Sequence, residues 1–329
     1  MSLRTGRTLF WAVSLILCLA GFLISLLTGP VRTTVGDLAR LFQEPDPVLW
    51  AVIVDLRLSR AVLAFLVGAA LALSGAILQG YFRNPMADPF VVGVSSGASL
   101  GAVVATALGF EAAAVGFSGP GLLAFLSGLS IVSLVYALSL RRGGFKVETL
   151  LLTGIAAGAL ASALTSFFLF MRSDSYEQAV FWLLGSFQIA EWSQAATIAP
   201  WFLVCLLASV WLARDMDLLA LGDETAQALG SPVRRVRKAF LAMSALLAAL
   251  AVAVSGIIGF VGLVVPHWVR ILIGPGHRPL FLASALAGGT FLLYCDLLAR
   301  NILPAELPIG VITAAVGAPF FLYLLHKKR

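Results

Sequence analysis

Long apolar runs alternate with short polar connections along this chain of 329 residues. A helix that crosses a membrane needs roughly 20 consecutive, mostly apolar residues. Runs such as LLAFLSGLSIVSLVYALSL lack the apolar–polar alternation of strands in a membrane β-barrel. The pattern therefore predicts about ten membrane-spanning helices, over residues 9–28, 58–80, 90–110, 118–140, 147–171, 194–213, 239–256, 259–273, 279–299 and 307–325.

The eighth of these runs is short and contains Pro266, so the helix boundaries between residues 256 and 279 are the least determined. Composition agrees with the pattern: 60% of the residues are hydrophobic and 12% are charged. A soluble globular chain has about 45–50% apolar and about 25% charged residues. We therefore expect one all-α, polytopic membrane domain over residues 1–329.

The distribution of charge sets the orientation of the spans, because cytoplasmic loops carry an excess of Lys and Arg. With the N-terminus inside, sixteen of the 22 Lys and Arg residues lie on the cytoplasmic side. Both termini are then cytoplasmic, and the net charge of +6 needs no nucleic-acid partner. The alternative of a cleaved signal peptide after Arg4 and Arg7 fits less well, because the first apolar run exceeds the usual 7–15 residues. Six arginines remain on the outer side: Arg32, Arg40, Arg57, Arg60, Arg172 and Arg300.

A polar stretch rich in Pro and Gly, FRNPMADPFVVGVSSGASLGA, covers residues 82–102 between two apolar runs. Irregular backbone at membrane depth is tolerated only where protein or a water-filled path covers it. Charged and polar side chains facing lipid are also costly. We therefore expect this stretch to serve a pathway or an assembly surface.

Small residues line one side of the fifth span, with Gly154, Gly158 and Ser162 at a spacing of four. Such a face lets another backbone approach closely, which is the commoner reason for it. The functional alternative is a face that lines a pathway for a bulky solute. The residues flanking this row are Ala157, Ala161 and Thr165.

The longest cytoplasmic connection, about 214–238, contains a predicted short helix that Asp223 and Glu224 open and Gly230-Ser231-Pro232 end. Leu221, Ala226 and Leu229 give this helix its apolar positions. Connections between packed helices usually have about 2–8 residues. A loop of this length with its own helix indicates contact with a partner protein.

Several activities are disfavoured by what the sequence lacks. It has no G-x-x-x-x-G-K-[ST] loop, so ATP hydrolysis through that motif is excluded. The three Cys and three His residues form no metal-ligand spacing, and we expect no metal or other cofactor. Glu148, Asp296 and Glu306 lie near span ends, whereas proton-coupled carriers usually place carboxylates mid-membrane.

The polar stretch closely resembles the signature of one membrane protein family, the FecCD permeases. Further resemblances, in order along the chain, are LLTGIAAGAL, FWLLGSF, LGDETAQALG, GFVGLVVPHWVR and AELPIGVITAAVGAPFFLYLL. The signature itself is carried by Arg83, Asn84, Pro85, Asp88, Pro89, Gly93, Ser95, Ser96 and Gly97.

The resemblance implies a permease subunit of a binding-protein-dependent ABC importer, with the ten-helix type II architecture. It implies a homodimer in the inner (plasma) membrane of a bacterium or archaeon, two cytoplasmic ABC ATPase subunits, and a periplasmic or lipid-anchored substrate-binding protein. The binding protein would dock on Arg57, Arg60 and Arg300, and the fifth span would line the pathway. The ATPase would contact a coupling segment containing Asp217, Leu221, Gly222, Asp223, Glu224, Ala226, Leu229 and Gly230.

The cargo is less determined than the transport class. A ferric siderophore is the default expectation by family frequency, and haem or cobalamin is the alternative. Two readings from other classes stay open on the residues alone: an ion-coupled secondary carrier, which needs a buried acidic or unwound site, and a structural membrane protein, which needs no long coupling segment. Asp296 and Arg300, four residues apart, could also form a simple structural pair.

Overall fold

The computed structural model describes residues 3–29, 31, 33–43, 46–110, 112–114, 116–140, 147–171 and 176–327. Within these ranges the regular secondary structure is helical, apart from one isolated bridge between Ala114 and Phe117. The expected all-α class is therefore confirmed. Seven of the basic residues used to orient the spans lie outside the described ranges: Arg32, Arg141, Arg142, Lys146, Arg172, Lys328 and Arg329.

Each predicted span has a helical counterpart. In the described part of the chain, seven helical stretches are long and apolar enough to cross a membrane, and three shorter apolar helices add to them. The short α13 contains Pro266, as expected. The counterparts are α1 (Leu3–Leu27), α4 (Ser59–Tyr81), α5 (Val94–Leu108), α6 (Gly119–Ser139), α7 (Val147–Met171), α9 (Trp192–Trp211), α12 (Val233–Ser255), α13 (Val261–Ile273), α14 (His277–Asn301) and α15 (Ile309–Lys327).

Four spans differ from the predicted boundaries by more than three residues; α1 and α12 each begin six residues earlier than predicted. The second begins earlier, because α3 (Pro47–Trp50) and the π-helical η1 (Ala51–Leu58) run continuously into α4. Asp46 caps this long helix by accepting from two backbone N–H groups of the first turn. The third begins later, because the 3₁₀-helical η2 (Pro89–Val92) ends at Gly93, whose φ of +94° interrupts the helix before α5.

The central helix α4 meets its neighbours through backbone contacts at two glycines, in addition to packed side chains such as Leu63 and Leu71. A Cβ atom at Gly75 would lie 1.8 Å from the carbonyl oxygen of Gly262 on α13. A Cβ atom at Gly68 would lie 2.3 Å from the carbonyl oxygen of Gly288 on α14. Glycine at these positions therefore lets three helices approach closely, as small residues do in membrane bundles. Most of α4 is buried inside the molecule.

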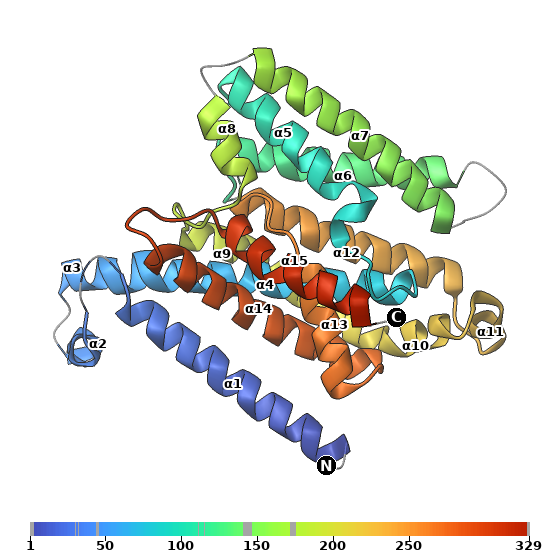
Figure 1. Cartoon of the computed structure of the whole chain (residues 1–329), viewed down its shortest axis with the longest axis horizontal. Coiled ribbons are helices and arrows are strands. Elements are labelled where there is room, and N and C mark those ends of the chain that lie inside the picture. Colours follow the sequence, from blue (N-terminus) through green and yellow to red (C-terminus); the bar gives the residue numbers. More distant parts are fainter. Residues whose placement is uncertain are drawn as a thin grey trace.

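A second group of helices lies to one side of this centre. Figure 1 shows α5, α6 and α7 together, with the short α8 (Tyr176–Leu183) beside them and α12 between this group and α4. The Ser127 hydroxyl of α6 donates to the carbonyl oxygen of Gly97 on α5 at 2.7 Å. Helix α1 lies on the opposite side, against α14 and α13.

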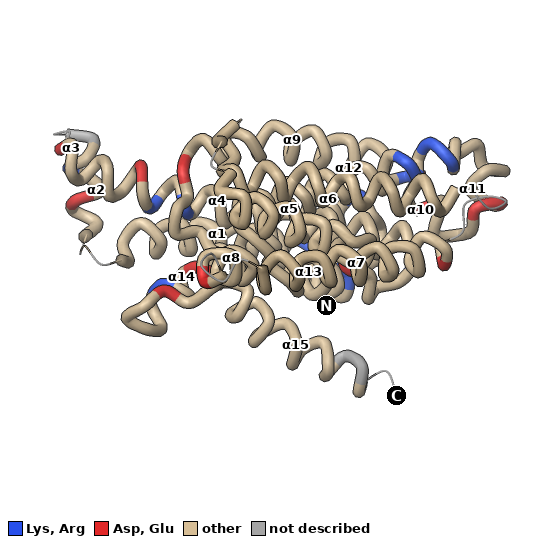
Figure 2. Tube along the Cα trace, turned by 90° about the horizontal axis from the view of Figure 1, so that it is seen from above, with Lys and Arg blue, Asp and Glu red and all other residues tan. Residues whose placement is uncertain are grey.

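Charged residues gather at the two ends of the long axis, and the part between them is almost free of charge (Figure 2). One end carries α2 (Val35–Gln43) and α3; the other carries the short helices α10 (Ala213–Ala220) and α11 (Asp223–Ala228). The N-terminal end of α1 and the C-terminal end of α15 both point toward the α11 end (Figure 1). This arrangement agrees with a membrane belt between the ends and with both termini on the cytoplasmic side.

Candidate functional site

The cytoplasmic end of the molecule carries two short helices that meet at a glycine. Helix α10 ends at Ala220, and Gly222 adopts a φ of +123° before Asp223 opens α11. Only glycine adopts such a conformation at little cost, so it fixes the point where the chain turns. The predicted loop helix is present, although α10 adds a helix that the sequence reasoning did not separate.

Asp223 ties α11 to α12 and to the connection that follows α4. Its carboxylate accepts from Arg237 on α12, with Nη2 at 2.6 Å and Nε at 3.1 Å, and from Arg83 after α4, with Nη2 at 2.5 Å. Burial raises the pKa of the Asp223 carboxyl, but the hydrogen bonds and charges of the two arginines outweigh it and hold the pKa below its ordinary value. The junction is therefore an ion pair shared by three segments.

A second junction fastens α10 to the first turn of α14. The Asp217 carboxylate accepts from the backbone N–H of His277 at 3.1 Å, and the same oxygen lies 2.6 Å from His277 Nδ1. Burial raises the pKa of the Asp217 carboxyl. The hydrogen bonds and the charge of His277 outweigh this effect and hold the pKa below its ordinary value. Asp217 thus supplies an acceptor for the N-terminus of α14 as well as a partner for its first side chain.

The predicted coupling residues lie together at this end, but they do not share one face. Leu221 and Leu229 are 65% and 55% exposed, whereas Ala226 is fully buried inside the chain. Of the three predicted apolar positions, Ala226 packs inward, and the two leucines offer apolar surface to a partner. Glu224 and Gly230 are also exposed, and Gly222 is partly buried.

The polar signature segment forms the ordered connection from α4 to α5 on the same side. Arg83 has a φ of +50°, an uncommon conformation for a residue with a side chain, and extends to Asp223. Asn84 accepts from the N–H of Met86, two residues beyond it. Pro85 borders this turn, and Pro89 opens η2 at a position where no N–H is needed.

Asp88 is the acidic residue of this segment, and it caps η2 by accepting from the backbone N–H of Phe90 at 2.8 Å. Burial raises the pKa of the Asp88 carboxyl to about 6, against the lowering effect of that hydrogen bond. The next residues of the signature are in packing contacts: Gly97 meets Ser127 and Gly128 of α6, and Ser96 approaches Gly158 of α7, while Ser95 is partly buried.

The small-residue face of α7 turns toward its own subunit. A Cβ atom at Gly154 would lie 2.8 Å from the carbonyl oxygen of Val91, and one at Gly158 would lie 3.2 Å from Ser96 Oγ. Ala161 and Thr165 continue this buried side. Ser162 is exposed and Ala157 is partly buried, because a spacing of four drifts around a helix of 3.6 residues per turn. Four of the six predicted pathway residues are therefore in a packing contact here.

The three outer arginines, which the resemblance implies as docking residues, are largely buried and have partners inside the subunit. Arg57 is 5% exposed and donates to the carbonyl oxygen of Leu26 at 2.6 Å and to Thr33 Oγ1 at 2.5 Å. Arg60 pairs with Asp296 at 2.9 Å and with Glu306 at 3.0 Å. Their charge is thus largely used inside the subunit.

Arg300 belongs to the same cluster. Its Nε lies 3.1 Å from Asp296 Oδ2, so the expected pair four residues apart is present, and its Nη2 donates to Ser25 Oγ on α1 at 2.8 Å. Asp296 is fully buried and serves both Arg60 and Arg300. The cluster joins the outer ends of α1, α4 and α14.

Sequence reasoning missed several of these partners. Arg237 was counted only as a topology charge, His277 was assigned no role, and Arg60 was not linked to Asp296. The only available signal was charge within otherwise apolar surroundings, which marks a residue that needs a partner but does not identify it. Among the described residues, no group of three or more His, Cys, Asp or Glu side chains could hold a metal ion.

Comparison with known proteins agrees with this architecture. The profile of the FecCD transport family matches residues 17–327. A cobalamin import system permease protein of Halobacterium salinarum is 44% identical over 84% of this chain and 74% of its own length. An iron(3+)-hydroxamate import system permease protein of Bacillus subtilis is 36% identical over the whole of both chains.

Among solved structures, a metal-chelate type ABC transporter in an inward-facing conformation superimposes with a TM-score of 0.87 at 34% identity. The match covers 98% of this chain and 99% of that one. The fold therefore matches along nearly the full length of both chains.

Proposed function

This chain belongs to the FecCD transport family, and we propose that it is the permease subunit of an ATP-driven importer that carries a ferric siderophore into the cytoplasm. Two copies would assemble in the inner membrane with two ATPase subunits, and a binding protein would deliver the cargo. The observation that carries this proposal is the pair of junctions at α10 and α11. They link a surface-exposed segment to α12, to α14 and to the α4–α5 connection through Asp217 and Asp223.

Such junctions provide a physical route for coupling. A force applied to α11 by an ATPase would reach α12 through Arg237 and the α4–α5 connection through Arg83. A force on α10 would reach α14 through His277. Exposed apolar side chains beside these polar junctions supply contact area for the partner, which supports Leu221 and Leu229 as docking residues.

The subunit interface would use the outer face of α7. This face carries large exposed apolar side chains, among them Leu152 at 68%, Leu160 at 64% and Phe170 at 88% exposure. Because Gly154 and Gly158 are covered by η2 and α5, a pathway between two copies would be lined by the other sides of α7, which include Ser162. We retain Ser162 as the pathway residue of this proposal, because Ala157 packs against the core of its own subunit.

Docking of the binding protein would take place at the opposite end, over the arginine cluster. Glu306 is the partly exposed member of that cluster, with 33% of its side chain accessible, whereas Asp296 is inaccessible. We therefore expect the arginine cluster to position the surface to which the binding protein docks. Direct pairing of Arg57, Arg60 or Arg300 with the partner would require the present contacts to open.

The cargo can be tested directly. Uptake of an iron-labelled ferric hydroxamate into vesicles containing the permease, its ATPase and its binding protein should exceed uptake of cobalamin. Cobalamin is the second candidate, supported by the 44% identity to the Halobacterium cobalamin permease. Preferential uptake of cobalamin by the same vesicles would replace the siderophore with that cargo and leave the transport class intact.

The coupling role needs a variant at an exposed position. Leu229→Arg adds a charge to apolar surface without filling a buried site, so uptake should fall while the subunits still fold. Leu229→Met keeps the apolar surface and should retain uptake. Ala226→Arg is not informative, because the buried position would disrupt α11 itself. Equal uptake by wild type and Leu229→Arg would remove this residue from the docking surface.

A further inference from the structure

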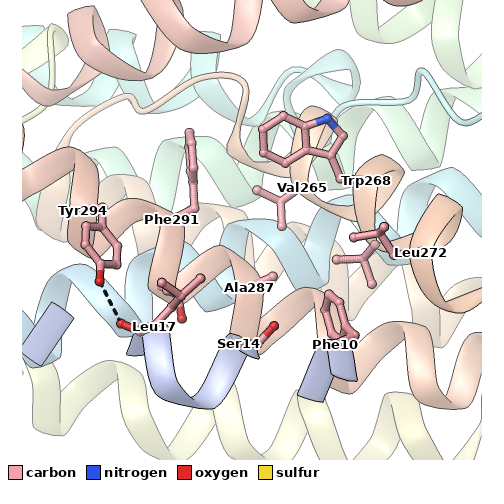
Figure 3. A pocket seen from close by; sticks show the side chains of 11 residues that line it. Phe10, Ser14, Leu17, Val265, Trp268, Leu272, Ala287, Phe291 and Tyr294 are labelled. Carbon is pink, nitrogen blue, oxygen red and sulfur yellow. Dashed lines mark hydrogen bonds between the residues drawn. The ribbon is translucent and has the colours of Figure 1, made fainter. Parts of the chain in front are cut away.

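An apolar groove of about 380 Å³ lies between α1 and the helices α13 and α14. Figure 3 shows the side chains that line it, including Phe10 from α1, Trp268 and Leu272 from α13, and Phe291 from α14. Its few polar groups are the hydroxyls of Ser14, Thr290 and Tyr294 and the indole N–H of Trp268. Those of Thr290 and Tyr294 already donate to the carbonyl oxygens of Leu286 and Leu17.

Polar contacts close the groove at both ends. At the cytoplasmic end, the Arg7 Nε donates to the carbonyl oxygen of Ile273, the last residue of α13, at 2.9 Å. At the other end, the Tyr294 hydroxyl donates to the carbonyl oxygen of Leu17 at 3.0 Å (Figure 3). Helix α1 is thus fixed at two positions along its length, Arg7 and Leu17, and the groove lies between α1 and the bundle in the part between them.

The length of the groove matches half a bilayer. Ten residues separate Arg7 from Leu17, which is about 15 Å along a helix that rises 1.5 Å per residue. The hydrocarbon core of a membrane is about 30 Å thick, so the groove spans the cytoplasmic leaflet. An acyl chain of that leaflet has the right length and polarity to fill it.

The charge at the mouth indicates the headgroup. Arg7, Phe10, Ser14 and Leu17 follow one another at helical spacing, so the arginine lies above the groove on the same face of α1. Arg7 is exposed, and within the described residues it forms no ion pair with a carboxylate. A guanidinium in this position complements a phosphate, and the cytoplasmic leaflet is where anionic lipids attract basic residues.

We propose that this groove binds an anionic phospholipid of the cytoplasmic leaflet, with one acyl chain between α1 and α13–α14 and the phosphate at Arg7. The lipid completes the packing of α1 against the bundle. A transported chelate does not fit, because a groove with so few polar atoms leaves the oxygens of such a ligand without partners. The inference concerns a site separate from the transport pathway.

Trp268 provides the probe, because it lines the groove. The protein in phosphatidylcholine nanodiscs receives a small fraction of phosphatidylglycerol whose acyl chains carry bromine, a quencher of indole fluorescence. The difference between wild type and Trp268→Phe isolates the signal of this tryptophan. We expect quenching at about fivefold lower lipid fraction with brominated phosphatidylglycerol than with brominated phosphatidylcholine, the factor that one basic residue near an anionic lipid provides.

Two variants and two controls locate the lipid. Ala287→Phe fills the groove and should abolish the selective quenching, whereas Val204→Phe adds the same ring at an exposed position of α9 and should not. Arg7→Gln should equalise the two lipids while acyl contact remains. Arg234→Gln removes an exposed charge from the same side of the membrane and should preserve the preference.

Unquenched Trp268, or undiminished selective quenching in a folded Ala287→Phe variant, would overturn the site. Equal quenching by both lipids in wild type would overturn the headgroup assignment. Protection of Trp268 only in chain dimers would place a second copy over the groove and would also overturn the proposal. If Ala287→Phe lowers the melting temperature, the Trp268→Phe difference in wild type alone decides occupancy.

Discussion

Arg60 on α4 donates through both Nε and Nη2 to the carboxylate of Asp296 on α14, which is fully buried. The same carboxylate lies 3.1 Å from the Nε of Arg300. One buried anion therefore serves two largely buried cations.

Removing that anion should be costly. Asp296→Asn leaves Arg60 and Arg300 without their shared charge partner, and breaking a buried pair in this way typically costs about 3–5 kcal/mol. We expect a clear fall in the melting temperature of the purified subunit. Glu306→Gln is the matched control, because the partly exposed Glu306 contributes no more than about 1 kcal/mol. A similar fall in melting temperature for the two variants would contradict the central role of Asp296.

The junction at Asp223 should control the order of α11. Asp223→Asn removes the charge that Arg83 and Arg237 share, so the backbone amides of α11 should exchange hydrogen faster, and uptake should fall while ATP hydrolysis by the complex continues. Glu224→Gln changes the neighbouring exposed carboxylate and should leave exchange unaltered. Hydrogen exchange followed by mass spectrometry compares the two variants with wild type. Unchanged protection of α11 in Asp223→Asn would argue against the junction.

Two substitutions on α7 distinguish residues that pack inside the subunit from residues that line the proposed pathway. Gly154→Ala places a methyl group 2.8 Å from the carbonyl oxygen of Val91, and overpacking of this kind costs about 1–3 kcal/mol. Its melting temperature should therefore fall. Ser162→Leu is at an exposed position and should leave the melting temperature near wild type. A loss of uptake at normal stability in Ser162→Leu would support the proposed pathway face, and normal uptake would count against it.

The stability of the subunit should depend on pH through Asp88. Its pKa of about 6 lies above the roughly 3.9 of an unfolded aspartate, so folding favours the protonated form. This contribution is fully present below about pH 4 and is lost as the pH rises through 6; two pKa units correspond to about 3 kcal/mol.

Asp88→Asn keeps the acceptor for the Phe90 N–H but cannot ionise. Melting temperatures between pH 4.5 and 7.5 should therefore fall less steeply for this variant than for wild type. Asp88→Ala loses the cap as well and should be less stable than Asp88→Asn at every pH, by about 0.5–2 kcal/mol. Parallel curves for wild type and Asp88→Asn would show that Asp88 does not titrate in this range.

The spans could be predicted from sequence because each depends on a local property, the length of an apolar run. The loop helix after Gly222 was predictable for the same reason, since Asp223, Glu224 and the Gly-Ser-Pro stop are local signals. Even the weak eighth span was placed correctly, with Pro266 inside it.

The rotation of each helix was not predictable in the same way. A spacing of four grouped Ser162 with Gly154 and Gly158, but the buried side follows 3.6 residues per turn and continues to Ala161 and Thr165. Helices that are apolar all round carry no pattern that distinguishes lipid from protein.

Pairings between distant segments could not be predicted from the sequence either. Arg60 and Asp296 are separated by 236 positions, and only the folded arrangement of α4 and α14 brings them together. Each charge signalled the need for a partner without identifying it. The same holds for Asp223 and Arg83, which are separated by 140 positions.

The backbone contacts of α4 with α13 at Gly75–Gly262 and with α14 at Gly68–Gly288 restrict how this molecule can change shape. At these two glycine pairs the backbones meet directly, so a small sliding step there would drive carbonyl groups into neighbouring backbone. We expect α4, α13 and α14 to travel as one rigid body, with rearrangement taken up at the boundary with α5, α6 and α7. Spin-label distances between α4 and α14 should then stay constant through a transport cycle, while those between α4 and α7 change.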